Sequence, residues 1–155
     1  HAGTPWAFNP LPANGPGFVR VNEDCAGGCL SLGYDFSNGA RAVIAATRVL
    51  LAGQPLGLSF DILGDASGTS LRAAYLNGVG ERFATIIAPS IDWRGWERRD
   101  VDLPPNAVPP IRFLGFSLVP HTNKSAGMIA LRAARVTVAG SRAPSPAFTL
   151  ERGSQ

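Results

Sequence analysis

Apolar and polar residues alternate through residues 58–103, and short turns rich in Gly, Asp and Asn interrupt the alternation at regular intervals. A residue and its second neighbour point to the same side of an extended chain, so each alternating run has one apolar face. Period-2 alternation between short turns is the signature of an antiparallel β-sandwich, and it predicts an all-β fold. The apolar positions that define the pattern are Leu58, Phe60, Ile62, Leu71, Ala73 and Tyr75.

The length and composition are those of one folded domain. At 155 residues the chain is long enough to bury a sizeable core. Hydrophobic residues make up 45% of it and charged residues only 16%, which excludes a disordered composition. The 18 Gly and 13 Pro are then the turn residues that an all-β protein needs.

Nine strands are expected along the chain. Residues 40–51 are ambiguous, because Ala favours helix while Val and Ile favour strand, and their position between strands decides for strand. We expect an extended segment at 1–17, a sandwich domain at 18–140 and a linker or tail at 141–155. The expected strands are residues 18–21, 29–36, 40–51, 56–63, 70–76, 82–88, 96–102, 111–119 and 126–139.

The charge pattern does not indicate a nucleic-acid partner. The formal net charge is +3, and the 13 Arg and one Lys are scattered rather than clustered with aromatic residues. No apolar run approaches the roughly 20 residues that a membrane span needs. No signal peptide is visible, and the chain opens on His1, so we expect a processed or excised piece of a longer protein.

Cys25 and Cys29 enclose Ala-Gly-Gly, a loop that can turn tightly enough to bring two sulfurs together. We predict a short-loop disulfide, as in secreted proteins. The alternative is two free thiols, one of them buried. A metal site is disfavoured, because two cysteines need two further ligands and the only histidines are His1 and His121.

Several short motifs follow one another in a fixed order. The motifs are Tyr-Asp-Phe at 34–36, Arg-Ala at 41–42, Gly-Asp-x-Ser-Gly at 64–68, Leu-Arg at 71–72, Gly-Glu-x-Phe at 80–83 and Ile-Asp-Trp-x-Gly-Trp at 91–96. Together they resemble a family of jelly-roll modules that look like carbohydrate-binding modules and occur in bacterial secreted proteins, including beside phosphodiester glycosidase domains. The resemblance covers residues 30–138.

The resemblance implies a jelly-roll, galactose-binding-like sandwich in a secreted or cell-surface protein. Similar modules often hold a structural calcium and carry Ile-x-Leu-Asp in the last strand, whereas residues 129–132 here end in Arg132. Calcium takes six to eight oxygen ligands, and a cation at that position would repel it. We therefore expect Arg132 to pair with an acid, Glu23 or Asp24, in place of the ion.

Trp93 and Trp96 are candidates for sugar stacking, because aromatic faces match the apolar faces of pyranose rings. Trp96 begins an expected strand, where an inward side chain belongs to the core. Trp93 stands in the turn before it and is expected to be partly exposed. Tyr75 is a weaker ligand-binding candidate, because alternation places it inward.

Arg72 and Arg82 are expected to point outward, because each adjoins an inward apolar residue. If their strands are neighbours, the two guanidiniums share one sheet face, which Arg112 could join. Arginine recognises hydroxyls, carboxylates or phosphates through several planar donors. The alternative is a solvated face whose arginines pair with Glu81 or Asp65.

No catalytic constellation is evident. Gly-x-Ser-x-Gly is absent, so His121 has no motif that would support a hydrolase. Asp100 and Asp102 share a strand face, where paired acids are more often solvated than catalytic.

The leading hypothesis is a monomeric, non-catalytic accessory module that binds an oligosaccharide or polysaccharide through Arg72, Arg82, Trp93 and Tyr75. The second hypothesis is a spacer that packs against a parent catalytic domain without binding sugar. A small glycan-active enzyme ranks third.

Overall fold

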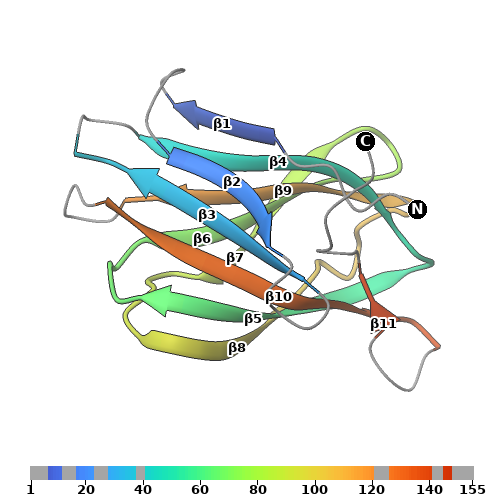
Figure 1. Ribbon diagram of the computed structural model, residues 1–155. Helices are drawn as coiled ribbons and strands as arrows, with labels where there is room; N and C mark the ends of the chain where they lie inside the picture. The colour runs from blue at the N-terminus through green and yellow to red at the C-terminus, as the bar shows by residue number, and fades with distance from the viewer. Residues whose placement is uncertain are drawn as a thin grey trace.

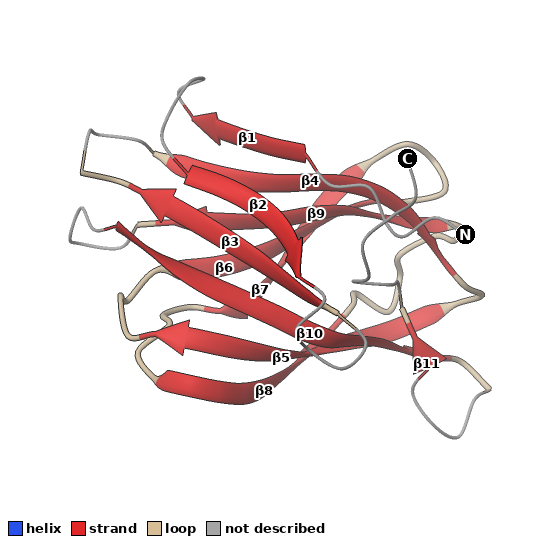
Figure 2. Ribbon diagram, in the orientation of Figure 1, coloured by secondary structure: helices blue, strands red, loops and turns tan. Residues whose placement is uncertain are grey.

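The computed structural model describes residues 7–11, 17–22, 28–37, 41–120, 126–140 and 145–147, and these form two antiparallel sheets with no helix (Figures 1 and 2). One sheet has the order β1-β4-β9-β6-β7; the other has the order β2-β3-β10-β5-β8, with β11 paired to β10. The described residues contain no helix that could cross a membrane. The strands are β1 (Ala7–Leu11), β2 (Gly17–Asn22), β3 (Cys29–Asp35), β4 (Ala42–Leu51), β5 (Pro55–Asp65), β6 (Ser70–Leu76), β7 (Arg82–Ala88), β8 (Arg94–Asp102), β9 (Ile111–Val119), β10 (Ala126–Val138) and β11 (Ser145–Pro146).

The expected all-β sandwich is confirmed, and the nine expected strands are β2 to β10, with ends that differ by at most two residues. Two further strands lie in the segments expected to be extended or a linker. β1 pairs with β4 at the edge of its sheet, the position at which a β-sheet tolerates a proline such as Pro10. β11 pairs with residues 135 and 136 of β10.

The core lies between the two sheets and is built from the alternating inward residues. Phe113 of β9 lies edge-on to Phe116, with ring centroids 5.0 Å apart, and Phe116 lies edge-on to Phe60 of β5 at 5.2 Å. Edge-to-face aromatic pairs of this kind add to the free energy gained by burial. These rings therefore join strands of opposite sheets.

The loop at residues 64–68 is bound to the segment that precedes β8. Backbone amides of Ala66 and Gly68 donate to the carbonyls of Trp93 and Ile91, both at 2.9 Å, and the Ile91 amide donates to Thr69. The Gly-Asp-x-Ser-Gly and Ile-Asp-Trp-x-Gly-Trp motifs are therefore joined by backbone hydrogen bonds.

Both tyrosines of the chain are buried. Burial raises the pKa of Tyr75 to about 12. Burial, followed by the hydrogen bond that the Tyr34 hydroxyl donates to Asp65, raises the pKa of Tyr34 as well. The unfolded chain has tyrosine pKa values near 10. Tyrosine burial therefore stabilises the fold below about pH 10, and this contribution is lost as the pH rises through the higher folded values.

We expect the two tyrosines to ionise as the protein unfolds at alkaline pH, and not while it is folded. The free energy of unfolding should fall above about pH 10, by up to about 1.4 kcal/mol per pH unit for each tyrosine. Absorbance titration of phenolate and urea unfolding at each pH would measure the two events. Tyr75→Phe should reduce the pH dependence. A tyrosine that ionises near pH 10 in the folded protein would contradict the prediction.

Candidate functional site

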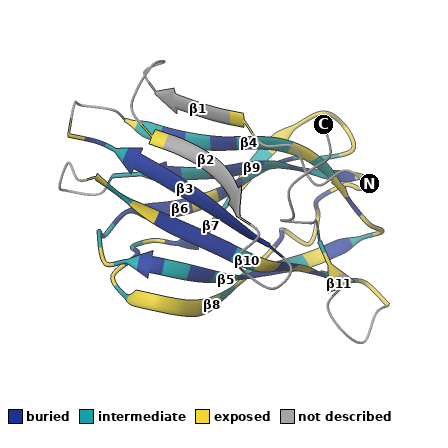
Figure 3. Cartoon of the chain, in the orientation of Figure 1, coloured by how far each residue is buried: buried dark blue, intermediate teal, exposed yellow. Residues whose placement is uncertain are grey.

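The outward face of β8 carries a row of polar and aromatic side chains. Alternation along the strand places Trp96, Arg98, Asp100 and Asp102 on one side. Figure 3 shows most of β8 as exposed. The row spans about 20 Å, the length of six residues of an extended strand.

Trp96 lies on this outward face, with 36% of its surface exposed. The prediction that Trp96 belongs to the core is wrong. The alternation of side chains along β8 gives the reason. Val101 packs against the core, and Trp96 lies five residues before it, so Trp96 points to the opposite side, as Asp100 does. Counting the phase back from Val101 would have placed Trp96 correctly.

Arg132 of β10 reaches across β5 to Trp96. Its guanidinium carbon lies 3.9 Å from the centroid of the Trp96 ring, and its Nε lies 3.4 Å from Oδ2 of Asp61. The expected acid partners Glu23 and Asp24 lie outside the described residues, and among the described residues the partner is Asp61. The described part of the chain holds no cluster of three acids, histidines or cysteines that could bind a metal.

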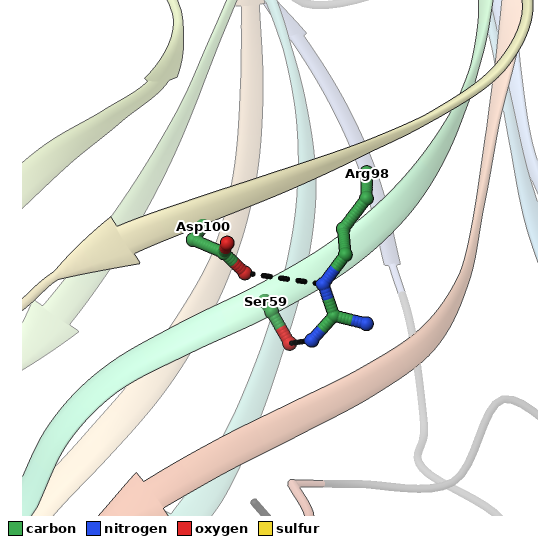
Figure 4. A network of polar contacts seen from close by, with 3 residues as sticks. All are labelled: Ser59, Arg98 and Asp100. Atoms are coloured by element: carbon green, nitrogen blue, oxygen red, sulfur yellow. Dashed lines mark hydrogen bonds and ion pairs between the residues drawn. The ribbon is translucent and has the colours of Figure 1, made fainter.

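Arg98 contacts both Ser59 and Asp100 on this face (Figure 4). It donates from Nη2 to the Ser59 hydroxyl at 3.0 Å and from Nε to the Asp100 carboxylate at 3.3 Å. The Asp100 side chain is 72% exposed, so this pair is solvated and costs little to open. A depression of about 280 Å³ lies here, lined in part by Gly57, Ser59, Arg98, Asp100, Asp102 and Thr137.

Trp93 is half-buried and packs against the core. Its ring nitrogen donates to the Ile62 carbonyl at 3.3 Å, and the Arg99 guanidinium lies 4.3 Å from its ring centroid. Arg99 is itself paired with Glu97 at 3.3 Å. Because the Trp93 ring packs against the core and Arg99 lies over it, Trp93 is a poorer stacking platform than expected.

Tyr75 cannot meet a ligand in this structure. It is 0% exposed, its ring stacks on Phe83 at 4.7 Å, and its hydroxyl is hydrogen-bonded to Thr85 at 2.8 Å. The candidacy of Tyr75 as a ligand-binding residue is therefore wrong. Alternation along β6 points it into the core with Leu71 and Ala73.

Arg72 and Arg82 lie on neighbouring strands, β6 and β7, and both are exposed. The ion pairs with Glu81 or Asp65 that the alternative predicts do not form among the described residues. Glu81 instead accepts a hydrogen bond from Asn77, and Asp65 accepts from Tyr34. The two guanidiniums are on the sheet opposite to Trp96, so the candidate residues divide between two faces.

Of the two cysteines, only Cys29 lies within the described residues. Cys29 begins β3 and is 2% exposed, while Cys25 lies outside the described residues. The pairing of Cys25 with Cys29 stays a prediction.

Comparison with known proteins gives structural matches only. No family model matches the sequence, and no curated protein matches it. A carbohydrate-binding module of the β-sandwich superfamily matches with a TM-score of 0.57 at 11% identity, over 85% of this chain and 56% of that one. A family 11 module from Clostridium thermocellum, solved with a β-1,3-1,4-mixed-linked tetrasaccharide, matches with a TM-score of 0.57 at 15% identity, over 86% of this chain and 89% of that one.

The fold is shared with carbohydrate-binding modules. It is also present within the enzymatically active domain of tailspike protein 4 of bacteriophage CBA120, with a TM-score of 0.51 at 15% identity. That match covers 85% of this chain but only 19% of the tailspike chain. At these identities the likeness shows the fold, and the function has to be argued from the chain's own residues.

Proposed function

We propose that this chain is a non-catalytic carbohydrate-binding module that holds a glycan along the outward face of β8. The observation that carries the proposal is Trp96, an exposed aromatic ring beside a polar row and a depression. The Arg132 guanidinium covers one face of this ring, so a pyranose would contact the other face of Trp96 or displace Arg132. Arg98, Ser59 and Asp100 would bond its hydroxyls, because they supply donors and acceptors at one place.

The surroundings of the acids support binding rather than turnover. Glycoside hydrolysis needs one carboxyl held protonated as a general acid, usually by burial. Asp100 is highly exposed and paired with Arg98, which is the arrangement of a solvated ion pair. Asp102 is exposed as well.

The distribution of exposed apolar side chains supports binding over a spacer role. A docking interface gathers such side chains into one broad patch. Here the large exposed apolar residues occur on both sheets and in two loops; they are Leu50, Leu56, Val79, Ile86, Trp96, Val108 and Met128. We further propose that the module belongs to a secreted or cell-surface bacterial protein and acts beside a catalytic domain that shares its glycan, such as a phosphodiester glycosidase, so that tethering compensates for weak binding.

Replacing Trp96 with Ala tests the site. Trp96→Ala should bind a soluble mixed-linked β-1,3-1,4-glucan at least about tenfold more weakly, because an exposed aromatic anchor contributes much of such binding energy. Val79→Ala, which removes an exposed apolar side chain from a distant turn, is the matched control and should bind like wild type. Affinity electrophoresis would measure both. Unchanged binding by Trp96→Ala would refute the site, and a wild-type protein that retains no neutral glycan would refute the function.

A further inference from the structure

The two sheets differ sharply in charge. The strands of the β1-β4-β9-β6-β7 sheet contain four arginines and no Asp or Glu; they are Arg48, Arg72, Arg82 and Arg112. The strands of the other sheet are balanced, with six arginines and six acids; the acids are Asp35, Asp61, Asp65, Glu97, Asp100 and Asp102. The outward side of the first sheet therefore presents positive charge that no acid of its own strands neutralises.

Three of these arginines alternate across adjacent strands β9, β6 and β7. Arg112 and Arg82 both stand opposite Leu76, one on each side of it. Arg72 lies four residues before Leu76 on β6, so it is displaced along the strands in the opposite direction. Neighbouring strands are about 4.8 Å apart. Going from β9 to β6 to β7, each strand therefore contributes one arginine, and these lie alternately at the Leu76 level and at the Arg72 level.

The residues paired across the middle of this face are small. Ala74 of β6 lies midway between Arg72 and Leu76, and it stands opposite Gly115 of β9 and Ala84 of β7. A linear chain could therefore cross the strands over Ala74, with the half-buried Leu114 of the β9 bulge as the one large side chain beside Gly115. It would have Arg72 on one side and Arg112 and Arg82 on the other.

The alternation matches one chemical class of polymer. Successive rings of an extended β-1,4-linked polysaccharide are turned over, so that the carboxylates of a β-1,4-linked polyuronate point to alternate sides. The advance from ring to ring in such a chain is close to the spacing between strands. Each carboxylate would meet one guanidinium, whose planar donors suit a carboxylate.

We propose that the outward face of β9, β6 and β7 is a second glycan site, which binds β-1,4-linked polyuronates through Arg112, Arg72 and Arg82. Arg72 and Arg82 are exposed and Arg112 is half-buried. Among the described residues none of the three is in an ion pair, and Arg72 makes only a 3.4 Å contact with the Ser70 hydroxyl. Binding therefore breaks no ion pair within the described chain.

The test compares a β-1,4-linked polyglucuronate, made by oxidising cellulose, with a soluble neutral β-1,4-glucan. The double variant Arg72→Gln, Arg82→Gln should bind the polyglucuronate at least about tenfold more weakly than wild type, because two charge-assisted contacts are lost. The matched control is Arg94→Gln, Arg135→Gln, which removes the same charge from exposed positions on the other sheet. Its affinity should fall less than about threefold, because only distant screened charge changes.

The outcomes also separate this site from the one on β8. Trp96→Ala should lose neutral glycan and keep polyglucuronate, and the Arg72→Gln, Arg82→Gln variant should do the reverse. Equal losses in the two arginine variants would overturn the proposal, because general charge would then explain the binding. Equal affinity of wild type for poly-L-glutamate would overturn it as well, since the sugar chain would contribute nothing. A wild-type protein that binds no polyglucuronate would overturn the proposal, and an acidic protein surface would then be the candidate partner of this face.

Discussion

Gly115→Ala is expected to destabilise the fold severely. Gly115 lies in β9, in the middle of its sheet, with a φ of +131° that side chains rarely adopt. An added Cβ would lie 2.1 Å from the Ala45 carbonyl oxygen and 3.0 Å from the Ala46 Cα. Both are backbone atoms of β4, so relief requires the two strands to separate. We expect a loss on the order of 3–5 kcal/mol, a large part of a typical domain's stability.

Gly80→Ala is the matched control for Gly115→Ala. Gly80 also has a positive φ, +85°, but an added Cβ would meet no atom within 4 Å. Only the conformational cost applies there, about 1 kcal/mol. Urea unfolding followed by circular dichroism would compare the two. Similar losses would show that close strand approach at Gly115 is not what requires glycine.

Trp93→Ala is expected to cost much more stability than Trp96→Ala. The Trp93 ring packs against the core and donates to the Ile62 carbonyl, so its removal leaves a cavity and an unpaired acceptor. Truncating a buried Trp costs about 3–5 kcal/mol, and half-burial places Trp93 near the lower end. Trp96→Ala loses a guanidinium contact worth about 0.5–1 kcal/mol together with the partial burial of an outward-facing ring, and it opens no cavity in the core.

Two outcomes would contradict the predicted order of the tryptophan variants. Equal losses in urea unfolding, or a larger loss for Trp96→Ala, would mean that Trp96 and not Trp93 supports the core. Glycan binding adds an independent measure. Trp93→Ala molecules that remain folded should keep their affinity for neutral glucan, whereas Trp96→Ala should not.

The outward faces of the two sheets differ in charge, and this difference would let one domain bind two kinds of glycan. On the β8 face, Arg98 and Arg132 are paired with Asp100 and Asp61, so the face offers donors and acceptors with little net charge. Such a surface suits neutral hydroxyls. On the opposite face the arginines have no acid among their own strands, which suits a polyanion. If both proposals hold, the module would bind neutral and acidic chains on opposite sides.

Local sequence determined the strands and most of the turns. Period-2 alternation in residues such as Leu58, Phe60 and Ile62 identifies an inward face because successive side chains of a strand point in opposite directions. The same rule placed Arg72 outward and Tyr75 inward. β1 and β11 were missed, because their Pro residues and short lengths give no alternation and only pairing with β4 and β10 makes them strands.

Only the tertiary structure decided which side chains meet. Trp96 and Arg132 are far apart in the sequence, and they come together because β8 and β10 both flank β5. The Arg132–Asp61 pair and the separation of Trp96 from Arg72 and Arg82 likewise follow from strand order. Alternation assigns a residue to a side of its own strand. It carries no information on which strands are neighbours, because pairing is set by long-range packing of the two sheets.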